Sequence, residues 1–224
     1  MLWIEKSNLP ELIQALGQDW VNHTHSLVSS HGKVAWLLSG GSTPSPFYEW
    51  LAKQDLPWNH IRLYLVDERM VKIQDAQSNE RMLREAFGPA FEKGAVLHSM
   101  VANLDNLDAN MAQTAQDYAS LNDIPFLCLL GMGQDGHTAS LFPNDAQSEL
   151  GLVPDSPALL LTLSPKPPHQ RMSVGVSVFK KAIKTYLLFA GAEKKAVCLH
   201  ASKERLPVAR VLEHLPNWAV YFTP

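Results

Sequence analysis

The chain has 224 residues, of which 46% are hydrophobic and 18% are charged, and its 19 Lys and Arg against 22 Asp and Glu give a formal net charge of -3. This composition is typical of a packed globular protein and excludes a disordered chain. The near balance of charge leaves no electrostatic footprint for nucleic acid or an anionic membrane. We predict one domain over residues 1–224, large enough to be stable without a disulfide or a structural metal.

The cysteine content and the N-terminal residues indicate the compartment. Cys128 and Cys198 lie in separate apolar stretches and form no CxxC pair, which predicts buried thiols in a reducing environment. No apolar run approaches the ~20 residues of a membrane helix, and residues 1–6 lack the features of a signal peptide. We therefore expect a soluble, cytoplasmic protein with no membrane partner, present as a monomer or a small homo-oligomer.

Hydrophobic patterning predicts strands alternating with helices. Seven β-branched and aliphatic runs are predicted strands: Lys33–Leu38, Ile61–Val66, Pro125–Leu130, Ala158–Leu163, Met172–Val178, Thr185–Ala190 and Trp218–Phe222. Five segments with apolar residues three and four apart are predicted helices: Asn8–Ser30, Pro46–Lys53, Asn79–Phe87, Leu107–Leu121 and Glu193–Ala201. Most strand runs are apolar almost throughout, as expected for strands covered on both faces. The order indicates an α/β protein with a mainly parallel sheet, whose ligands bind beyond the carboxyl ends of the strands.

The first candidate site is the segment SGGSTP at residues 39–44, directly after a predicted strand. A helix is expected to open at about Pro44, so that amides at its start would face an anion. The residues that would hold the anion are Gly40, Gly41, Ser42 and Thr43. The pattern fits a phosphate monoester site, and it fits equally well a tight turn with a Ser/Thr cap.

The second candidate site is the triplet DER at residues 67–69, followed by SN at 78–79. A carboxylate at the end of a strand, here Asp67, is placed to orient a base or to hold a substrate hydroxyl. Arg69 offers a planar guanidinium that suits phosphate. Taken alone, the triplet is more often a surface turn with an ion pair.

The third candidate site is the segment GMGQDGHTASLFP at residues 131–143, after another predicted strand. Its three glycines allow the backbone to fold tightly around a ligand, and His137 lies among small residues. Histidine is the side chain best matched to proton transfer near neutral pH. We favour a catalytic His137 over a histidine of the core or surface.

Two basic positions also fall at junctions of strand and loop. Arg171 opens one predicted strand, and Lys194 and Lys195 follow another; each suits either phosphate binding or a solvated face. The other histidines show no ligand spacing, so a zinc site is not expected. The chain contains no GxSxG segment, which disfavours a serine hydrolase.

Together these segments resemble the 6-phosphogluconolactonase family, within the larger group that includes glucosamine-6-phosphate deaminase/isomerase. The similarity rests on residues 39–44, 67–69 with 78–79, and 131–143, and it continues more weakly through Arg171, residues 191–194 and the segment LPVAR at 206–210. It runs in order along nearly the whole chain.

The third segment separates the two main members of the group. The deaminases carry a segment of the type GHIAFNEP, in which a glutamate follows the histidine, whereas residues 136–143 here read GHTASLFP without a carboxylate. Arg69 also resembles the lactonases, because the deaminases usually have Tyr there. A deaminase/isomerase remains the nearest alternative, and a non-catalytic sugar-phosphate sensor is a second one, disfavoured by the presence of His137.

The resemblance implies a three-layer α/β/α fold of modified Rossmann type, without metal or cofactor. It implies hydrolysis of 6-phospho-D-glucono-1,5-lactone in the oxidative pentose phosphate pathway, with His137 as general base. Asp67 is our first choice for the residue that orients His137, and Asp135 is the alternative. The implied phosphate-binding residues are Gly40, Gly41, Ser42, Thr43, Arg69, Arg171 and Lys194.

Overall fold

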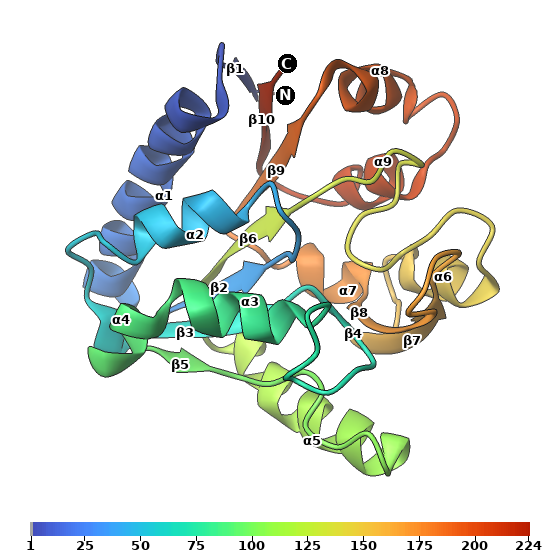
Figure 1. Cartoon of the computed structure of the whole chain (residues 1–224), viewed down its shortest axis with the longest axis horizontal. Coiled ribbons are helices and arrows are strands. Elements are labelled where there is room, and N and C mark those ends of the chain that lie inside the picture. Colours follow the sequence, from blue (N-terminus) through green and yellow to red (C-terminus); the bar gives the residue numbers. More distant parts are fainter. Residues whose placement is uncertain (1) are drawn as a thin grey trace.

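A seven-stranded parallel sheet forms the centre of the computed structural model, which describes residues 2–224 (Figure 1). Its strand order is β1-β10-β9-β6-β2-β3-β5, and every neighbouring pair is parallel. The strands are β1 (Leu2–Glu5), β2 (Val34–Leu38), β3 (Ile61–Leu65), β5 (Val96–Leu97), β6 (Phe126–Leu130), β9 (Lys184–Ala190) and β10 (Trp218–Thr223). Five of these confirm predicted strands to within one residue at each end, whereas the short edge strands β1 and β5 were not predicted.

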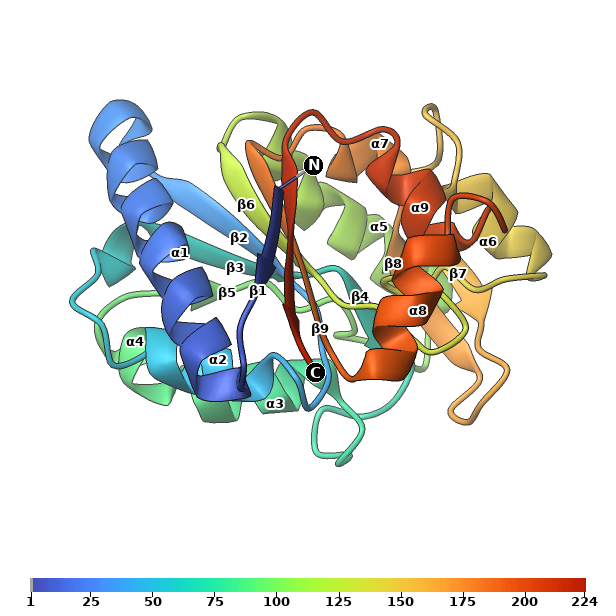
Figure 2. The ribbon, with the colours of Figure 1, turned by 90° about the horizontal axis from the view of Figure 1, so that it is seen from above.

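Helices cover both faces of this sheet, which confirms the three-layer architecture (Figures 1 and 2). Right-handed crossovers place α1 to α4 on one face, because the chain moves from β1 to β2, β3 and β5 in one direction across the sheet. The chain then returns through β6, β9 and β10, which puts α5, α7, α8 and α9 on the other face. The helices are α1 (Leu9–His31), α2 (Ser45–Leu51), α3 (Asn79–Ala86), α4 (Gly88–Glu92), α5 (Leu107–Ala119), α6 (Ala146–Gly151), α7 (Val176–Phe179), α8 (Ala192–His200) and α9 (Pro207–Leu212).

Two of the predicted strands, Ala158–Leu163 and Met172–Val178, contribute to a second, antiparallel sheet and not to the parallel one. β4 (Asp67–Arg69), β8 (Gln170–Val174) and β7 (Leu159–Leu163) pair in the order β4-β8-β7, apart from the parallel sheet. The run predicted as one strand, Met172–Val178, is wrong beyond Val174, because Gly175 caps the helix α7 there. A short apolar run does not distinguish a strand from a buried helix by periodicity alone.

Aromatic packing holds the long helix α1 against the middle of the parallel sheet. Trp36 of β2 packs edge-on against Trp20 of α1 and against Trp58, with ring centroids 5.6 and 5.5 Å apart. Such pairs add roughly 0.5–1.5 kcal/mol beyond their buried area. The side chain of Asn8 caps α1 by accepting from the amide of Glu11, and Gly32 ends it in the left-handed region at φ 76°. This packing fixes β2, whose carboxyl end leads into the first site segment.

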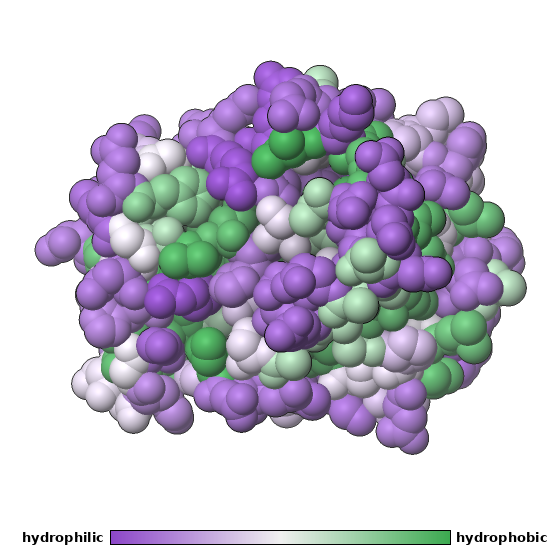
Figure 3. All heavy atoms as spheres, turned by 90° about the horizontal axis from the view of Figure 1, so that it is seen from below, coloured by the Kyte–Doolittle hydropathy of each residue, from purple (hydrophilic) through white to green (hydrophobic). Residues whose placement is uncertain are grey.

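On the face seen from below in Figure 3, apolar residues lie in patches among polar ones. The large exposed apolar side chains belong to different segments of the chain: Leu2, Val96, Leu150, Val153, Leu163, Ile183 and Leu199. Scattered exposure of this kind is ordinary for globular proteins. Among the helices within residues 2–224, none has the length and apolar character required to cross a bilayer.

Candidate active site

A cleft lies beyond the carboxyl ends of β2, β6 and β9, where the parallel fold places ligands. Its volume is about 260 Å³, below the ~300–1,000 Å³ of pockets for drug-sized ligands and suited to a small polar metabolite. Eight of the candidate residues line it together: Gly40, Gly41, Ser42, Thr43, Asp67, Arg69, His137 and Lys194. Met132 and Ala139 of the third segment also line the cleft. Leu188 lines it as well and lies outside the predicted segments, because an apolar residue within a strand carries no chemical signal in a sequence.

The first segment presents unpaired backbone amides to the cleft. The amides of residues 40–43 donate to no group within residues 2–224, and Gly41 adopts φ 112°, which favours glycine. A Cβ at position 40 would lie 1.9 Å from Oδ1 of Asn79, so only glycine lets the Asn79 side chain reach this loop. The helix α2 follows directly, with Pro44 as its N-cap residue.

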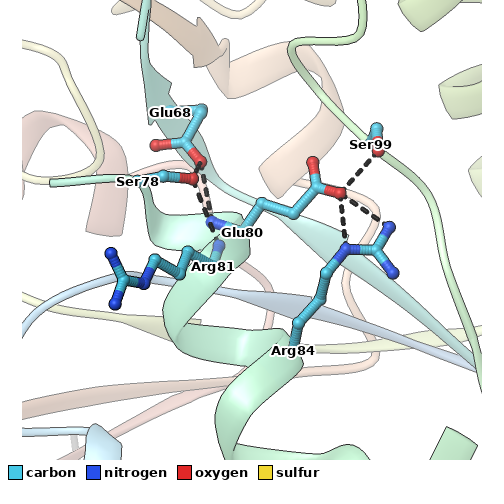
Figure 4. A network of polar contacts seen from close by, with 6 residues as sticks. All are labelled: Glu68, Ser78, Glu80, Arg81, Arg84 and Ser99. Atoms are coloured by element: carbon cyan, nitrogen blue, oxygen red, sulfur yellow. Dashed lines mark hydrogen bonds and ion pairs between the residues drawn. The ribbon is translucent and has the colours of Figure 1, made fainter. Parts of the chain in front are cut away.

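A buried carboxylate fixes the second segment. Glu68 is 1% exposed and accepts hydrogen bonds from the amide of Glu80 and the hydroxyl of Ser78 (Figure 4). It also accepts from the amides of Arg69 and Asn79. Burial raises the pKa of Glu68, although these four hydrogen bonds act in the opposite direction. The carboxylate thereby joins β4 to the start of α3, which explains why DER and SN occur together in the sequence.

The helix α3 is tied down further along by a second carboxylate. Glu80 Oε1 accepts from Nε and Nη2 of Arg84 at 2.9 and 2.7 Å and from the hydroxyl of Ser99 at 2.7 Å (Figure 4). At the start of the same helix, Nδ2 of Asn79 donates to the backbone carbonyl of Asp67 at 2.9 Å. The wall of the cleft formed by β4 and α3 is therefore fixed by hydrogen bonds at several points.

His137 and Asp135, both in the third segment, form a hydrogen-bonded pair. Nδ1 of His137 lies 2.5 Å from Oδ1 of Asp135, and the imidazole packs against the ring of Phe142 at 4.8 Å. Burial alone would raise the pKa of Asp135, but the hydrogen bond and charge of His137 outweigh it and lower that pKa. An ionised Asp135 accepts a hydrogen bond from Nδ1–H of His137, which leaves Nε2 to act on a ligand.

The glycines of this segment make room for the pair. A Cβ at position 133 would lie 2.2 Å from the imidazole of His137 and 2.6 Å from Oδ1 of Asp135. Gly136 has φ 76°, in the left-handed region that other residues avoid. The predicted tight fold of the backbone is therefore present, and its glycines leave space for the side chains of His137 and Asp135.

Asp67 lies in the same cleft but is not the partner of the imidazole. Its Oδ2 accepts a hydrogen bond of 2.5 Å from the hydroxyl of Ser140. The contact with His137 is made by Asp135, the alternative in the sequence analysis, and not by Asp67, the first choice. The physical reason is the tight turn at Gly136, which brings residues 135 and 137 together locally.

Three cations in or beside the cleft, Arg69, Arg171 and Lys194, form no ion pair with a carboxylate within residues 2–224. Arg69 donates to the carbonyl of Gln77 at 2.5 Å. Arg171 is 7% exposed, and its Nη1 is sealed from solvent with no described partner. Burial lowers the pKa of Lys194, which lines the cleft. The neighbouring Lys195 does not line the cleft and forms an ion pair with Glu5 at 2.7 Å. A buried cation without an ion pair, such as Arg171, favours a bound anion.

Metal-ligating side chains do not gather in the described part of the chain: residues 2–224 contain no group of three or more His, Cys, Asp or Glu suited to a metal ion. Cys128 is buried and Cys198 is half-buried, and both are free thiols. Burial raises the pKa of the Cys198 thiol to about 11, which makes it a poor nucleophile at neutral pH.

Comparison with known proteins identifies the family. Residues 7–219 match the family described as glucosamine-6-phosphate isomerases/6-phosphogluconolactonase, and the chain belongs to it. The chain is 34% identical over 193 residues to a 6-phosphogluconolactonase of Pseudomonas putida, covering 86% of this chain and 79% of that protein. A crystal structure of a 6-phosphogluconolactonase from Shewanella baltica superposes with a TM-score of 0.91 at 25% identity, covering 100% and 98% of the two chains.

A longer relative contains a similar unit. The chain is 37% identical over 221 residues to the GDH/6PGL endoplasmic bifunctional protein of Oryctolagus cuniculus, covering 90% of this chain and 27% of that protein. The chain therefore spans about a quarter of the length of this relative.

Proposed function

We propose that this protein is an enzyme that hydrolyses 6-phospho-D-glucono-1,5-lactone to 6-phospho-D-gluconate, in the oxidative pentose phosphate pathway. The observation that carries the proposal is the shared cleft: the imidazole of His137, the unpaired amides of residues 40–43 and Lys194 all line one cavity. The similarity to 6-phosphogluconolactonases over most of the chain supports the same substrate.

The residues after His137 favour a lactonase over a deaminase. Residues 138–143 carry no carboxylate, and the side chains of Leu141 and Phe142 are buried, at 0% and 4% exposure. A deaminase of this family requires a glutamate from this segment. Among the lining residues of the cleft within residues 2–224, Asp67 is the one carboxylate, and Asp135 is bonded to His137.

Phosphate binding is assigned to the first segment and the unpaired cations. The amides of residues 40–43 and the hydroxyls of Ser42 and Thr43 would donate to the phosphate oxygens. Lys194 lines the cleft and would supply a compact positive charge. Arg69 and the buried Arg171 would add charge from the antiparallel sheet. Anchoring the phosphate, remote from the reacting carbonyl, orients the lactone for attack.

His137 is the proposed general base. Asp135 accepts a hydrogen bond from Nδ1–H, so Nε2 is unprotonated and takes a proton from water as the water oxygen bonds to C1 of the lactone. The tetrahedral oxyanion requires donors, for which the amides of the glycine-rich segments are the natural candidates. The bond from C1 to the ring oxygen then breaks, and the imidazolium returns its proton to that oxygen to give the open-chain acid.

Freshly prepared lactone tests the proposal directly. Proton release is followed at constant pH with enzyme, and the spontaneous hydrolysis measured without enzyme is subtracted. The same enzyme is incubated with glucosamine 6-phosphate, and ammonia is measured. Lactone hydrolysis without ammonia release supports the proposal, whereas ammonia release would assign the chain to the deaminase branch.

A further inference from the structure

Ser140 joins the third segment to every strand of the antiparallel sheet. Its hydroxyl donates to Oδ2 of Asp67 on β4 at 2.5 Å, and its amide donates to the hydroxyl of Ser173 on β8 at 3.2 Å. Its carbonyl accepts from the hydroxyl of Thr162 on β7 at 2.7 Å. The residue is 1% exposed, and each of its three polar groups has a partner on a different strand.

The bond from Ser140 leaves half of the Asp67 carboxylate available. Oδ2 is taken by Ser140, whereas Oδ1 accepts from no side chain or amide within residues 2–224 and is not sealed from solvent. The backbone of Asp67 is held as well, because Asn79 donates to its carbonyl. Asp67 lines the cleft and is 8% exposed. A nearly buried carboxylate with one free oxygen favours a donor from the ligand.

We propose that Ser140 is a positioning residue that holds Asp67 so that Oδ1 accepts a hydrogen bond from a ring hydroxyl of the substrate. This assignment rests on the proposed function. The lactone has hydroxyls at C2, C3 and C4 only, since C1 reacts, C5 carries the ring oxygen and C6 carries the phosphate. Asp67 is thus assigned to the sugar ring, while Asp135 serves the imidazole.

Substrate analogues that lack one ring hydroxyl measure the proposed hydrogen bond from that hydroxyl to Oδ1 of Asp67. The 2-deoxy, 3-deoxy and 4-deoxy derivatives of the lactone keep the phosphate and the reacting carbonyl. The wild-type enzyme is expected to lose about 10- to 100-fold in kcat/KM on one of them, the range for a hydrogen bond to a charged group. The ratio of kcat/KM between the parent lactone and that analogue is the readout.

Three variants test whether the bond from Ser140 to Asp67, and not merely the attachment of the third segment to the antiparallel sheet, sets this ratio. Ser140→Ala removes the hydroxyl that holds Asp67, and the ratio is expected to fall at least about threefold toward one as Asp67 loses its fixed orientation. Thr162→Val, the matched control, removes a bond to the Ser140 carbonyl and keeps the bond to Asp67. This control is expected to retain the wild-type ratio whatever it does to absolute rates. Asp67→Asn, which keeps the size of the side chain and removes its charge, is expected to lower the ratio as Ser140→Ala does.

Each outcome decides the assignment. A selective loss on one analogue in the wild type, reduced by Ser140→Ala and by Asp67→Asn but not by Thr162→Val, supports it. If the wild type hydrolyses the lactone but treats all three analogues within about threefold of it, or if Ser140→Ala and Thr162→Val change the ratio equally, the assignment is wrong and the proposed function stands. If Ser140→Ala does not fold, Ser140→Cys, which keeps the size and replaces the hydroxyl with a weak donor, takes its place with the same expected fall in the ratio. Absence of any lactone hydrolysis by the wild type overturns both.

Discussion

Arg69 and Arg171 face each other in register across the antiparallel pair of β4 and β8. Like charges directly opposite one another destabilise a sheet, and the charge of Arg69 adds to burial in lowering the pKa of Arg171. Neither guanidinium forms an ion pair within residues 2–224. The charges of Asp67 and Glu68 act in the opposite direction, and an anion bound near both guanidinium groups would reduce their repulsion further.

Replacing Arg171 is therefore expected to affect binding more than chemistry. Arg171→Ala should chiefly raise KM, because it removes charge that acts on the ground state and the transition state alike. Initial rates over a range of lactone concentrations measure KM and kcat separately, and the free energy of unfolding is measured beside them because the side chain is buried. An unchanged KM in a folded variant would remove Arg171 from the phosphate site.

The lowered pKa of Lys194 predicts how binding depends on pH. Its ammonium loses its proton at a lower pH than an ordinary lysine, because burial disfavours the charged form. A phosphate monoester stays doubly ionised above its second pKa of about 6. The affinity for 6-phospho-D-gluconate should therefore fall as the pH rises from neutral toward the ordinary lysine value of 10.5.

Calorimetric titrations at several pH values measure this dependence. Lys194→Met removes the charge and is expected to weaken binding about 10- to 100-fold at neutral pH, with a shallower decline at alkaline pH than the wild type. A wild-type slope retained in Lys194→Met would place the titrating group elsewhere.

His137→Ala tests the general base. We expect kcat to fall by at least ~10²-fold, the lower end of what general base catalysis supplies. The side chain is 33% exposed, so the fold should tolerate the change, and circular dichroism with a thermal melt verifies this. Near-wild-type turnover by the folded variant would falsify the assignment of the base.

Asp135→Asn tests the partner of the imidazole. An amide in this position would donate to Nδ1 and favour the tautomer whose proton is on Nε2, which cannot accept a proton from water. We expect kcat to fall at least ~10-fold with KM nearly unchanged. Asp155→Asn, at a fully exposed aspartate, is the control for the same change of charge. Equal rates for both variants would contradict the role of Asp135.

Gly133→Ala tests the space beneath the imidazole. The added Cβ would fall 2.2 Å from the His137 ring, so the pair with Asp135 must shift. We expect a loss in kcat of at least ~10-fold, since small displacements of a catalytic group are costly. Gly88→Ala, where a Cβ meets nothing within 4 Å, is the control. The prediction is wrong if both variants keep wild-type kcat.

The sequence by itself determined the parallel core and the segments of the site. Runs such as Val34–Leu38 and Phe126–Leu130 are completely buried, so their composition alone identifies strands covered on both faces. The clusters of glycine, hydroxyl and charged residues follow these strands directly. Because parallel strands end at one edge, the sequence also predicts that His137 and residues 40–43 meet there.

The pairing of particular side chains was decided only by the tertiary structure. The sequence favoured Asp67 over Asp135 as the partner of His137, but the turn at Gly136 brings Asp135 to the imidazole, and Asp67 binds the hydroxyl of Ser140 instead. The antiparallel sheet was also hidden, because apolar runs such as Leu159–Leu163 carry no information about which neighbour they pair with. Composition and periodicity report burial, whereas hydrogen-bond partners depend on contacts between residues far apart in the chain.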